Sequence, residues 1–322
     1  MKAISLSRYG GPEVLQLDPQ APQPTPASSQ VLVQVSYAGV NYIDTYYREG
    51  IYPHDLPFIP GFEGVGTVVH DPQGEIATGT RVAWCDGLGS YAEYVCVPRD
   101  RLVAVAEDVD GPTAASMLLQ GITAHYLSHG VYPLAKGDTC VITAGAGGVG
   151  LILTQLAVAA GATVISLVST DDKEQLSREA GAQHVLRYSD HIAADVRELT
   201  DDRGVDVVYD GVGAATFAQS LKSLRPKGTL ALFGAASGPV EKFDPQELNA
   251  HGSLFLTRPS IGAWTSGPGE FAMRAQAITQ AIADGSLSIR VGHVYDLKEA
   301  AQAHRDLQQR KTTGSLVLKV SD

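Results

Sequence analysis

The residues best suited to chemistry are the glycines of segment 144–150, which have the spacing GxGxxG. The spacing alone is weak evidence, but this segment follows an apolar strand pattern at 139–143 and opens a helix pattern at 149–160. In that context, glycines allow a tight turn, a close approach of a pyrophosphate to the backbone and close packing of helix on strand. The motif predicts a dinucleotide site, the alternative being a plain tight turn. The predicted contacts are Gly145, Gly147, Gly148, Val149 and Gly150.

The residues after the second strand of this unit bear on which dinucleotide binds. NAD-binding versions place an acid there, about 20 residues after the glycines, for the ribose 2′-hydroxyl. Here the strand ends before Ser169 and Thr170, which can donate hydrogen bonds to a 2′-phosphate, and Lys173 can add positive charge. Asp171 and Asp172 oppose this interpretation unless they face solvent at a helix N-terminus, and Lys173 has the alternative of a solvated surface lysine. The pattern favours NADPH.

The elements around the turn alternate between strands and helices from about residue 114 onward. Such alternation predicts a parallel sheet covered on both faces. The first third instead contains short strands separated by turn residues, which is typical of a small barrel-like β domain. Strands are expected at 31–35, 64–69, 91–97, 139–143, 162–168, 205–209, 229–233, 253–256 and 316–320, and helices at 149–160, 173–180, 214–224 and 271–284.

Composition and charge exclude several classes of function. The 322 residues fit two domains, and the formal net charge of −11 disfavours nucleic acids and anionic membranes as partners. The chain has three cysteines, an odd number without CxxC spacing, and shows neither a signal peptide nor an apolar run of transmembrane length. We therefore expect a globular protein of the cytoplasm that binds small molecules.

Four motifs together resemble one known family. They are Gly10-Gly11-Pro12-Glu13-Val14-Leu15, Asn41-Tyr42-Ile43-Asp44-Thr45-Tyr46, Ala146-Gly147-Gly148-Val149-Gly150 and Leu254-Phe255-Leu256-Thr257-Arg258-Pro259-Ser260. They resemble the zinc-independent, zeta-crystallin-like quinone oxidoreductases of the medium-chain dehydrogenase/reductase superfamily. The resemblance covers almost the whole chain.

The resemblance implies an α/β fold of two domains. Residues 121–259 would form a Rossmann domain with a doubly wound parallel sheet. Residues 1–120 and 260–322 would form a GroES-like catalytic domain of the β-barrel type, with the active site in the cleft between the domains. A homodimer that pairs through the Rossmann domain is the family expectation.

The resemblance also implies that no metal is bound. Zinc dehydrogenases of this superfamily carry Gly-His-Glu with a zinc-binding His, where this chain has Gly61-Phe62-Glu63, and their first cysteine ligand falls near Asn41. Phenylalanine cannot bind zinc and asparagine is a poor ligand. Without a Lewis acid, an acceptor that takes hydride readily is expected, such as a quinone or a conjugated enone.

By resemblance, Asn41, Tyr46, Tyr52 and Thr123 surround the nicotinamide and the acceptor. Asn41 would hydrogen-bond the cofactor or the substrate oxygen, and either tyrosine would stack on a quinone ring or donate a proton. Packing within the β domain is the alternative for Tyr46. Arg258 is either an active-site residue or an exposed charge after an edge strand.

Five further residues match cofactor positions of the family. Lys173 and Tyr188 correspond to contacts of the adenosine 2′-phosphate, and Arg310 to a late basic residue near the cofactor. Phe233 and Gly234 correspond to the loop beneath the nicotinamide, at the carboxyl end of a strand.

The leading hypothesis is an NADPH-dependent quinone reductase that transfers hydride without zinc. Whether the overall products are those of one-electron reduction is left open. One alternative is an NADPH-dependent enone or alkenal reductase, because substrate choice depends on pocket shape. The other is a catalytically slow cofactor-binding protein.

Overall fold

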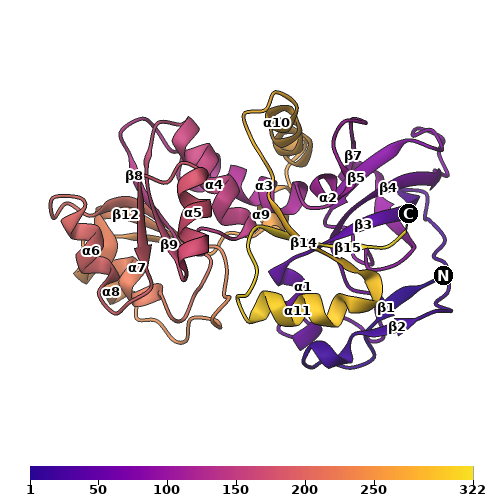
Figure 1. Cartoon of the computed structure of the whole chain (residues 1–322), viewed down its shortest axis with the longest axis horizontal. Coiled ribbons are helices and arrows are strands. Elements are labelled where there is room, and N and C mark those ends of the chain that lie inside the picture. The colour runs from indigo at the N-terminus through magenta and orange to yellow at the C-terminus, as the bar shows by residue number, and fades with distance from the viewer. Residues whose placement is uncertain (322) are drawn as a thin grey trace. The chain divides into compact units, whose positions relative to one another are not determined.

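The computed structural model describes residues 1–321. The chain folds as two compact units, of which unit 1 comprises Met1–Gln120 and Pro268–Asp322, and unit 2 comprises Gly121–Gly267. In Figure 1, unit 2 runs from magenta to orange, whereas unit 1 takes the indigo and purple start and the gold and yellow end of the chain. Unit 1 is therefore built from both ends of the sequence and unit 2 from its middle.

The second boundary between the units differs from the expected one at residue 260. Helix α9 (Ile261–Trp264) stays with unit 2, because Trp264 stacks on Tyr126 with ring centroids 5.8 Å apart and planes within 7°. The indole also covers Gly130, where an added Cβ would lie 2.6 Å from the ring. The chain therefore returns to unit 1 only at Pro268.

Unit 2 contains a six-stranded sheet in the order β10-β9-β8-β11-β12-β13, in which every pairing is parallel. Renumbered within the unit, this order is 3-2-1-4-5-6, the doubly wound arrangement of dinucleotide-binding domains. The chain reverses its direction of travel across the sheet between β8 and β11, so a ligand is expected at the carboxyl ends of those strands. The strands are β8 (Thr139–Ile142), β9 (Thr163–Val168), β10 (His184–Arg187), β11 (Val205–Asp210), β12 (Leu224–Leu232) and β13 (Phe255–Thr257).

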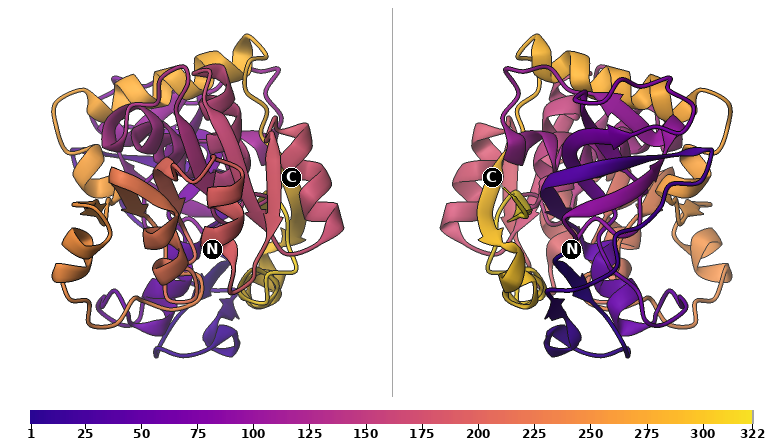
Figure 2. Two further views of the ribbon diagram at one scale, coloured as in Figure 1. Left: turned by 90° about the vertical axis from the view of Figure 1, so that its left-hand side faces the viewer. Right: turned by 90° about the vertical axis from the view of Figure 1, so that its right-hand side faces the viewer.

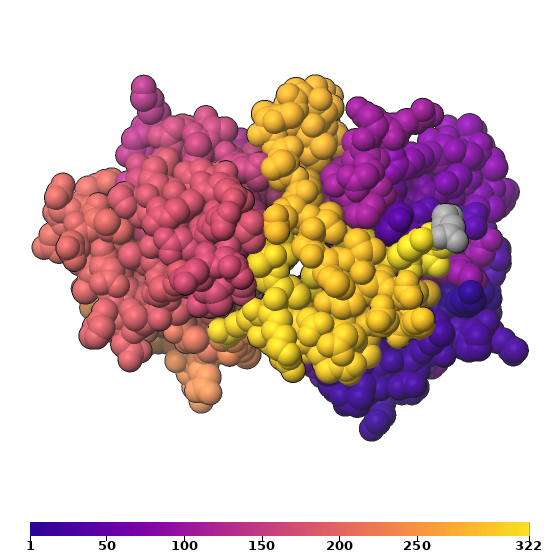
Figure 3. Space-filling view, in the orientation of Figure 1, coloured from indigo at the N-terminus to yellow at the C-terminus, as the bar shows by residue number. Residues whose placement is uncertain are grey.

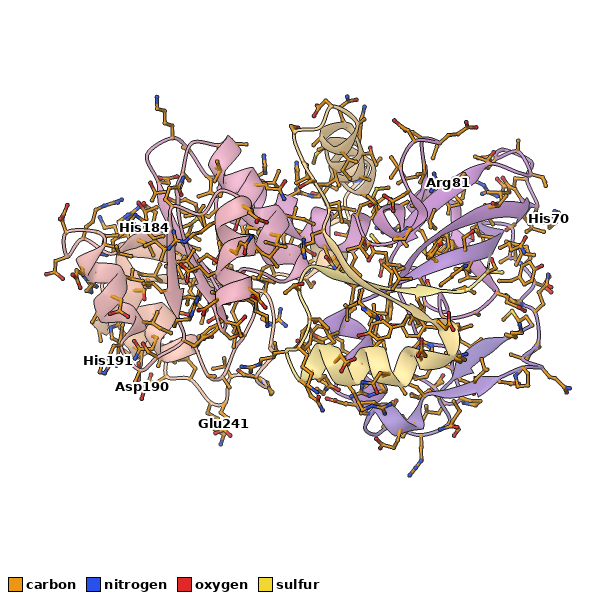
Figure 4. All side chains as sticks on the ribbon, viewed as in Figure 1. His70, Arg81, His184, Asp190, His191 and Glu241 are labelled. Carbon is orange, nitrogen blue, oxygen red and sulfur yellow. The ribbon has the colours of Figure 1, made fainter. Side chains whose placement is uncertain are left out.

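Helices cover both faces of this sheet, which explains why strands such as β11 are buried along their whole length. Figure 1 shows α4 and α5 on one face, with α6 and α7 on the other. Figure 4 labels His184 at the start of β10, and Asp190 and His191 just before α6. The helices are α3 (Leu118–Tyr126, which begins in unit 1), η3 (Leu127–Val131), α4 (Gly148–Ala159), α5 (Asp171–Glu179), α6 (Ile192–Glu198), α7 (Phe217–Ser223) and α8 (Gln246–Ala250).

Unit 1 is organised around a seven-stranded sheet in the order β14-β15-β3-β4-β5-β7, with β6 also paired to β3. All pairings are antiparallel except that of β14 with β15. The right-hand view in Figure 2 shows the indigo and purple strands of this sheet. The strands are β3 (Gln30–Val40), β4 (Glu63–His70), β5 (Arg81–Cys85), β6 (Tyr94–Pro98), β7 (Leu102–Ala104), β14 (Val291–Asp296) and β15 (Ser315–Lys319), beside a small ladder of β1 (Ala3–Ser5) and β2 (Gln16–Asp18).

The expected strand at 91–97 begins only at Tyr94. Tyr91 and Ala92 instead join the N-terminal strand, because the Tyr91 carbonyl accepts from Ile4 N at 2.8 Å and Ala92 forms an isolated bridge with Ala3. The side chain of Tyr91 is fully buried in the core of unit 1 together with Trp84.

The remaining helices of unit 1 pack around this sheet. The space-filling view in Figure 3 shows α11 in yellow beside the indigo N-terminal segment, where it contacts η1. No helix among the described residues is both long and apolar enough to span a membrane. The helices are η1 (Pro12–Val14), α1 (Tyr42–Glu49), η2 (Arg99–Arg101), α2 (Gly111–Ala114), α10 (Glu270–Ala283), η4 (Leu297–Glu299) and α11 (Ala300–Gln308).

Candidate active site

The Gly-rich turn joins β8 to α4 as the motif predicts, and its geometry requires glycine. A Cβ on Gly145 would lie 1.7 Å from Ser166 Oγ, and a Cβ on Gly150 would lie 2.4 Å from the Ala144 carbonyl oxygen. Gly147 N donates to that same carbonyl at 2.9 Å, which closes the turn, and Ala144 itself has a φ of 51°. The turn therefore tolerates no larger side chain at either glycine.

Helix α4 begins at Gly148, and Gly147 precedes it as an N-cap that offers no side-chain acceptor. The first N–H groups of a helix have no partner within the helix, so those of Gly148, Val149 and Gly150 are available to an anion. The positive end of the helix dipole lies at the same place. This donor set suits a pyrophosphate at the carboxyl end of β8.

Tyr188 lies directly against this turn. Its hydroxyl accepts a hydrogen bond from Ala144 N at 2.7 Å and donates to the Leu167 carbonyl at 3.3 Å. The phenol therefore ties the Gly-rich turn to the end of β9.

The residues predicted at the end of β9 lie together at the start of α5. Ser169 and Thr170 are exposed, and Thr170 caps α5 by accepting from Lys173 N at 3.4 Å. Asp171 is fully exposed at the helix N-terminus, as the sequence allowed. Two hydroxyls and a half-buried lysine thus follow β9, in the segment where NAD-specific folds carry an acid.

Arg187, the last residue of β10, was not among the predicted site residues. Its Cα is the register partner of Val168, so Arg187 lies beside the end of β9. Its Nη2 lies 2.7 Å from carboxylates of both Asp171 and Glu174, while Nη1 is buried without a hydrogen-bond partner. Because no strand was predicted at 184–187, nothing in the sequence indicated that this arginine lies near Ser169.

Asp210 fixes the loop after β11, opposite the Gly-rich turn. Its carboxylate is fully buried. It accepts from Val212 N at 2.9 Å, Thr216 Oγ1 at 2.8 Å and Ser220 Oγ at 2.7 Å. Thr143, after β8, donates to it at 3.2 Å and accepts from Gly211 N at 2.9 Å. The two loops that flank the predicted ligand position are thereby tied together.

Phe233 and Gly234 also lie at this carboxyl-end edge of the sheet. A Cβ on Gly234 would lie 2.4 Å from the Gly211 carbonyl oxygen, and a Cβ on Gly211 would lie 2.8 Å from the Phe233 ring. The guanidinium of Arg258, although exposed, donates to the Phe233 carbonyl at 2.8 Å. Arg258 therefore holds this loop in place.

In unit 1, Asn41 belongs to a buried hydrogen-bonded chain. Its Nδ2 donates to Glu63 Oε2 at 2.8 Å, and its Oδ1 accepts from Gln120 Nε2 at 3.0 Å. Asn41 is 5% exposed and Glu63 is fully buried. Burial raises the pKa of Glu63 to about 8, although hydrogen bonds from Leu119, Asn41 and Leu118 oppose that rise.

A second buried chain of hydrogen-bonded side chains includes Arg48 and Asp44 of α1. Arg48 Nη1 lies 3.0 Å from His304 Nδ1, and His304 Nε2 lies 3.1 Å from Tyr91 Oη, which donates to Asp44 Oδ2 at 2.8 Å. An arginine can only donate, so His304 carries its proton on Nε2. Burial, followed by the charge of Arg48, lowers the pKa of His304 to about 3, and burial raises that of Asp44 to about 7. Asp44 Oδ2 also accepts from Asn41 N at 2.7 Å, so this chain fixes the backbone of Asn41.

Tyr46 and Tyr52 form an aromatic cluster with Tyr47 and Phe62. Tyr52 makes edge contacts with Tyr46 and Tyr47, both at 5.6 Å between centroids, and Tyr47 packs on Phe62 at 4.6 Å. Tyr46 is half-buried and Tyr52 is 38% exposed. Phe62, which the resemblance places at the position of the zinc-binding histidine of related dehydrogenases, is therefore a buried member of this aromatic cluster.

Thr123 and Arg310 lie on separate elements. Thr123 is buried on α3 in unit 2. Arg310 follows α11 in unit 1, is exposed and has a φ of 57°. Its charge opposes the rise in pKa that burial causes at Tyr42, so it lies near α1.

Two histidines of unit 2 stand one helical turn apart. The rings of His125 and His129 stack 4.2 Å apart with planes within 2°. Within residues 1–321, no three His, Cys, Asp or Glu side chains are grouped so as to hold a metal ion.

Comparisons with known proteins identify the family. A profile described as alcohol dehydrogenase GroES-like domain matches residues 27–107, and one described as zinc-binding dehydrogenase matches residues 148–280. The chain is 40% identical to the quinone oxidoreductase of Pseudomonas aeruginosa, over 98% of this chain and 99% of that protein. The chain belongs to the zinc-independent quinone oxidoreductases of the medium-chain dehydrogenase/reductase superfamily.

Two other relatives bear on cofactor and substrate. A mycobacterial protein solved in complex with NADPH is 48% identical, with a TM-score of 0.96 over 99% of this chain and 100% of that one. The 2-haloacrylate reductase of a Burkholderia species is 37% identical over 98% of both chains. The predicted α/β fold, with GroES-like and dinucleotide-binding parts, and the predicted oxidoreductase class are both confirmed.

Proposed function

We propose that this chain is an NADPH-dependent quinone reductase. The observation that carries the proposal is the Gly-rich turn, which opens α4 beside the end of β9. Ser169 and Thr170 follow β9 there in place of an acid, and Arg187 of β10 lies next to it. The NADPH complex of the mycobacterial relative supports the same cofactor.

The residues of unit 2 fit this cofactor. The N–H groups of the first turn of α4 would bind the pyrophosphate, and Ser169, Thr170, Lys173 and Arg187 would bind the 2′-phosphate. Arg187 Nη1 is a buried donor without a hydrogen-bond partner, and it lies close to the proposed position of the 2′-phosphate. When bound, NADPH supplies a hydride, and the protein contributes orientation and electrostatic stabilisation.

The residues of unit 1 fit an acceptor with a carbonyl oxygen. Asn41 would donate to that oxygen, where negative charge develops as hydride arrives, through the Nδ2 hydrogen that Glu63 does not use. Tyr52 would pack against the acceptor ring, since it is the more exposed tyrosine of the aromatic cluster. A planar quinone suits both contacts.

A second candidate is reduction of an activated alkene. The 37% identity to a 2-haloacrylate reductase favours it, because an alkene conjugated to a carbonyl accepts hydride at carbon and places negative charge on the same kind of oxygen. Both reductions would use the same cofactor and the same hydrogen-bond donor, Asn41, and only the shape of the acceptor site would differ.

An acceptor panel tests the proposal. We expect NADPH oxidation at 340 nm with 1,4-benzoquinone and 9,10-phenanthrenequinone, and little with 2-hexenal. Turnover of the enone alone would replace quinone reduction with alkene reduction. Tight NADPH binding without turnover of any acceptor would instead indicate a cofactor-binding protein.

A cytoplasmic homodimer is the corresponding proposal for the assembled protein. Free Cys85, Cys96 and Cys140 support a reducing compartment. Light scattering during size-exclusion chromatography tests the dimer, and a monomer mass would refute it.

A further inference from the structure

Glu63 is a buried carboxylate whose position in the fold does not require a charge. It is fully buried, and within residues 1–321 it forms no ion pair with a basic side chain. Burial of an unpaired carboxylate is costly, and an apolar side chain of similar volume would commonly be more stable. Stability alone therefore does not explain why this position carries a carboxylate.

The hydrogen bonds of Glu63 all run in one direction. Oε1 accepts from Leu118 N at 2.9 Å and from Leu119 N at 2.8 Å, while Oε2 accepts from Asn41 Nδ2 at 2.8 Å. Backbone N–H groups can only donate, so Glu63 Oε1 is held as an acceptor at the beginning of α3.

This polarity sets the orientation of the Asn41 side chain. An amide presents a donor on one side and an acceptor on the other, and its two flipped forms are distinguished by their partners. Because an ionised Glu63 only accepts, Asn41 Nδ2 must face it above the Glu63 pKa of about 8, and Oδ1 then faces Gln120 Nε2 at 3.0 Å. Gln120 is oriented in turn by Ser315, whose hydroxyl donates to its Oε1 at 2.7 Å.

We propose that Glu63 is a positioning residue that holds Asn41 with one Nδ2 hydrogen bound and the other left to donate to the acceptor oxygen. This inference rests on the proposed function, in which Asn41 is the donor. The flipped amide would present its carbonyl oxygen to Glu63 and to the acceptor side, which would repel developing negative charge.

Substitution of Glu63 by glutamine tests this arrangement with little change of volume. The single carbonyl oxygen of the introduced amide would satisfy either the N–H groups of Leu118 and Leu119 or Asn41 Nδ2, but not both. At pH 9, where Glu63 is ionised, we expect E63Q to lower kcat/KM for 9,10-phenanthrenequinone roughly 10- to 100-fold, the range for a hydrogen bond to a charged group. The Kd for NADPH, measured by protein fluorescence, should not change.

A double-mutant cycle separates positioning from general support of the fold. If Glu63 acts through Asn41, then N41A alone and N41A/E63Q together have the same kcat/KM. A matched control is D206N, which alters a buried carboxylate at the start of β11 in unit 2 and should lower the thermal midpoint without this loss of kcat/KM.

Three outcomes overturn the inference, and they are distinguishable. Wild-type kcat/KM in N41A would remove Asn41 as the donor and refute that part of the proposed function as well. A loss in N41A with none in E63Q, or losses that multiply in the double variant, would refute the positioning role alone. Equal kcat/KM in N41A and N41A/E63Q, with a loss in E63Q, supports it.

Discussion

The hydroxyl of Tyr188 lies 2.7 Å from Ala144 N and thereby anchors the Gly-rich turn to the neighbouring strand. Tyr188, which the family resemblance assigns to the 2′-phosphate, therefore also shapes the pyrophosphate site. We predict that Y188F weakens NADPH and NADH binding by the same factor, roughly 2- to 10-fold, the value of one neutral hydrogen bond. Titration of both cofactors by fluorescence checks this. A loss confined to NADPH would show that the hydroxyl acts only on the phosphate.

Lys173 and Arg187 should instead discriminate between the two cofactors. We expect K173A and R187Q each to weaken NADPH binding roughly 10- to 100-fold and to leave NADH binding nearly unchanged, because charged hydrogen bonds to a phosphate are lost. R178Q is the control, since Arg178 lies in the last turn of α5, where it pairs with Glu174 of the first turn. Equal losses for both cofactors would contradict the assignment.

The burial of Glu63 predicts a dependence of stability on pH. Its pKa is about 8 in the folded protein against 4.5 ordinarily, so the folded state holds a proton that the unfolded state has lost between those values. The stabilisation is complete below about pH 4.5 and is lost as the pH rises through about 8, by up to about 1.4 kcal/mol per pH unit. Asp44, with a pKa of about 7, also makes the free energy of unfolding fall as the pH rises. His304, whose pKa is lowered, makes the free energy of unfolding rise with pH, but only below pH 6.5.

Urea unfolding of the wild type and E63Q between pH 6.5 and pH 8 measures the contribution of Glu63. Cys85 and Tyr91 also interact with this carboxyl, but burial keeps the pKa of each well above its ordinary value, so neither titrates in that interval. The free energy of unfolding should fall more steeply with pH in the wild type than in E63Q. Parallel slopes would show that Glu63 is ionised throughout.

The aromatic cluster around the buried Phe62 predicts that activity needs no metal. Treatment with a strong chelator should leave quinone reduction unchanged, because the histidine ligand of zinc dehydrogenases is replaced by a ring packed on Tyr47. Elemental analysis of the purified protein provides the check. Stoichiometric zinc together with loss of activity on chelation would contradict the prediction.

The sequence predicted the dinucleotide-binding part of the fold well because its signals are local. The glycines of 144–150 and the apolar runs around them follow from short-range packing rules. Strand β10 was missed because its four residues are only half-buried and contain His184 and Arg187, so it lacks an apolar pattern. Without β10, Arg187 could not be placed beside Ser169.

The buried hydrogen-bonded chains of side chains in unit 1 could not be predicted from local sequence patterns. Asn41, Glu63, Gln120 and Ser315 come from four distant segments, and His304 reaches Arg48 across most of the chain. The resemblance singled out Asn41 but gave no reason for its orientation, which depends on these long-range contacts.

Single-turnover reduction of 9,10-phenanthrenequinone by the purified protein, followed at 340 nm with NADPH and, separately, with NADH, is the experiment that bears most strongly on NADPH-dependent quinone reduction. We predict rapid oxidation of NADPH in the presence of the quinone, and reaction with NADH only at much higher cofactor concentrations. Equal reaction with both cofactors at equal concentrations would contradict NADPH selectivity, and no reaction with either would contradict quinone reduction.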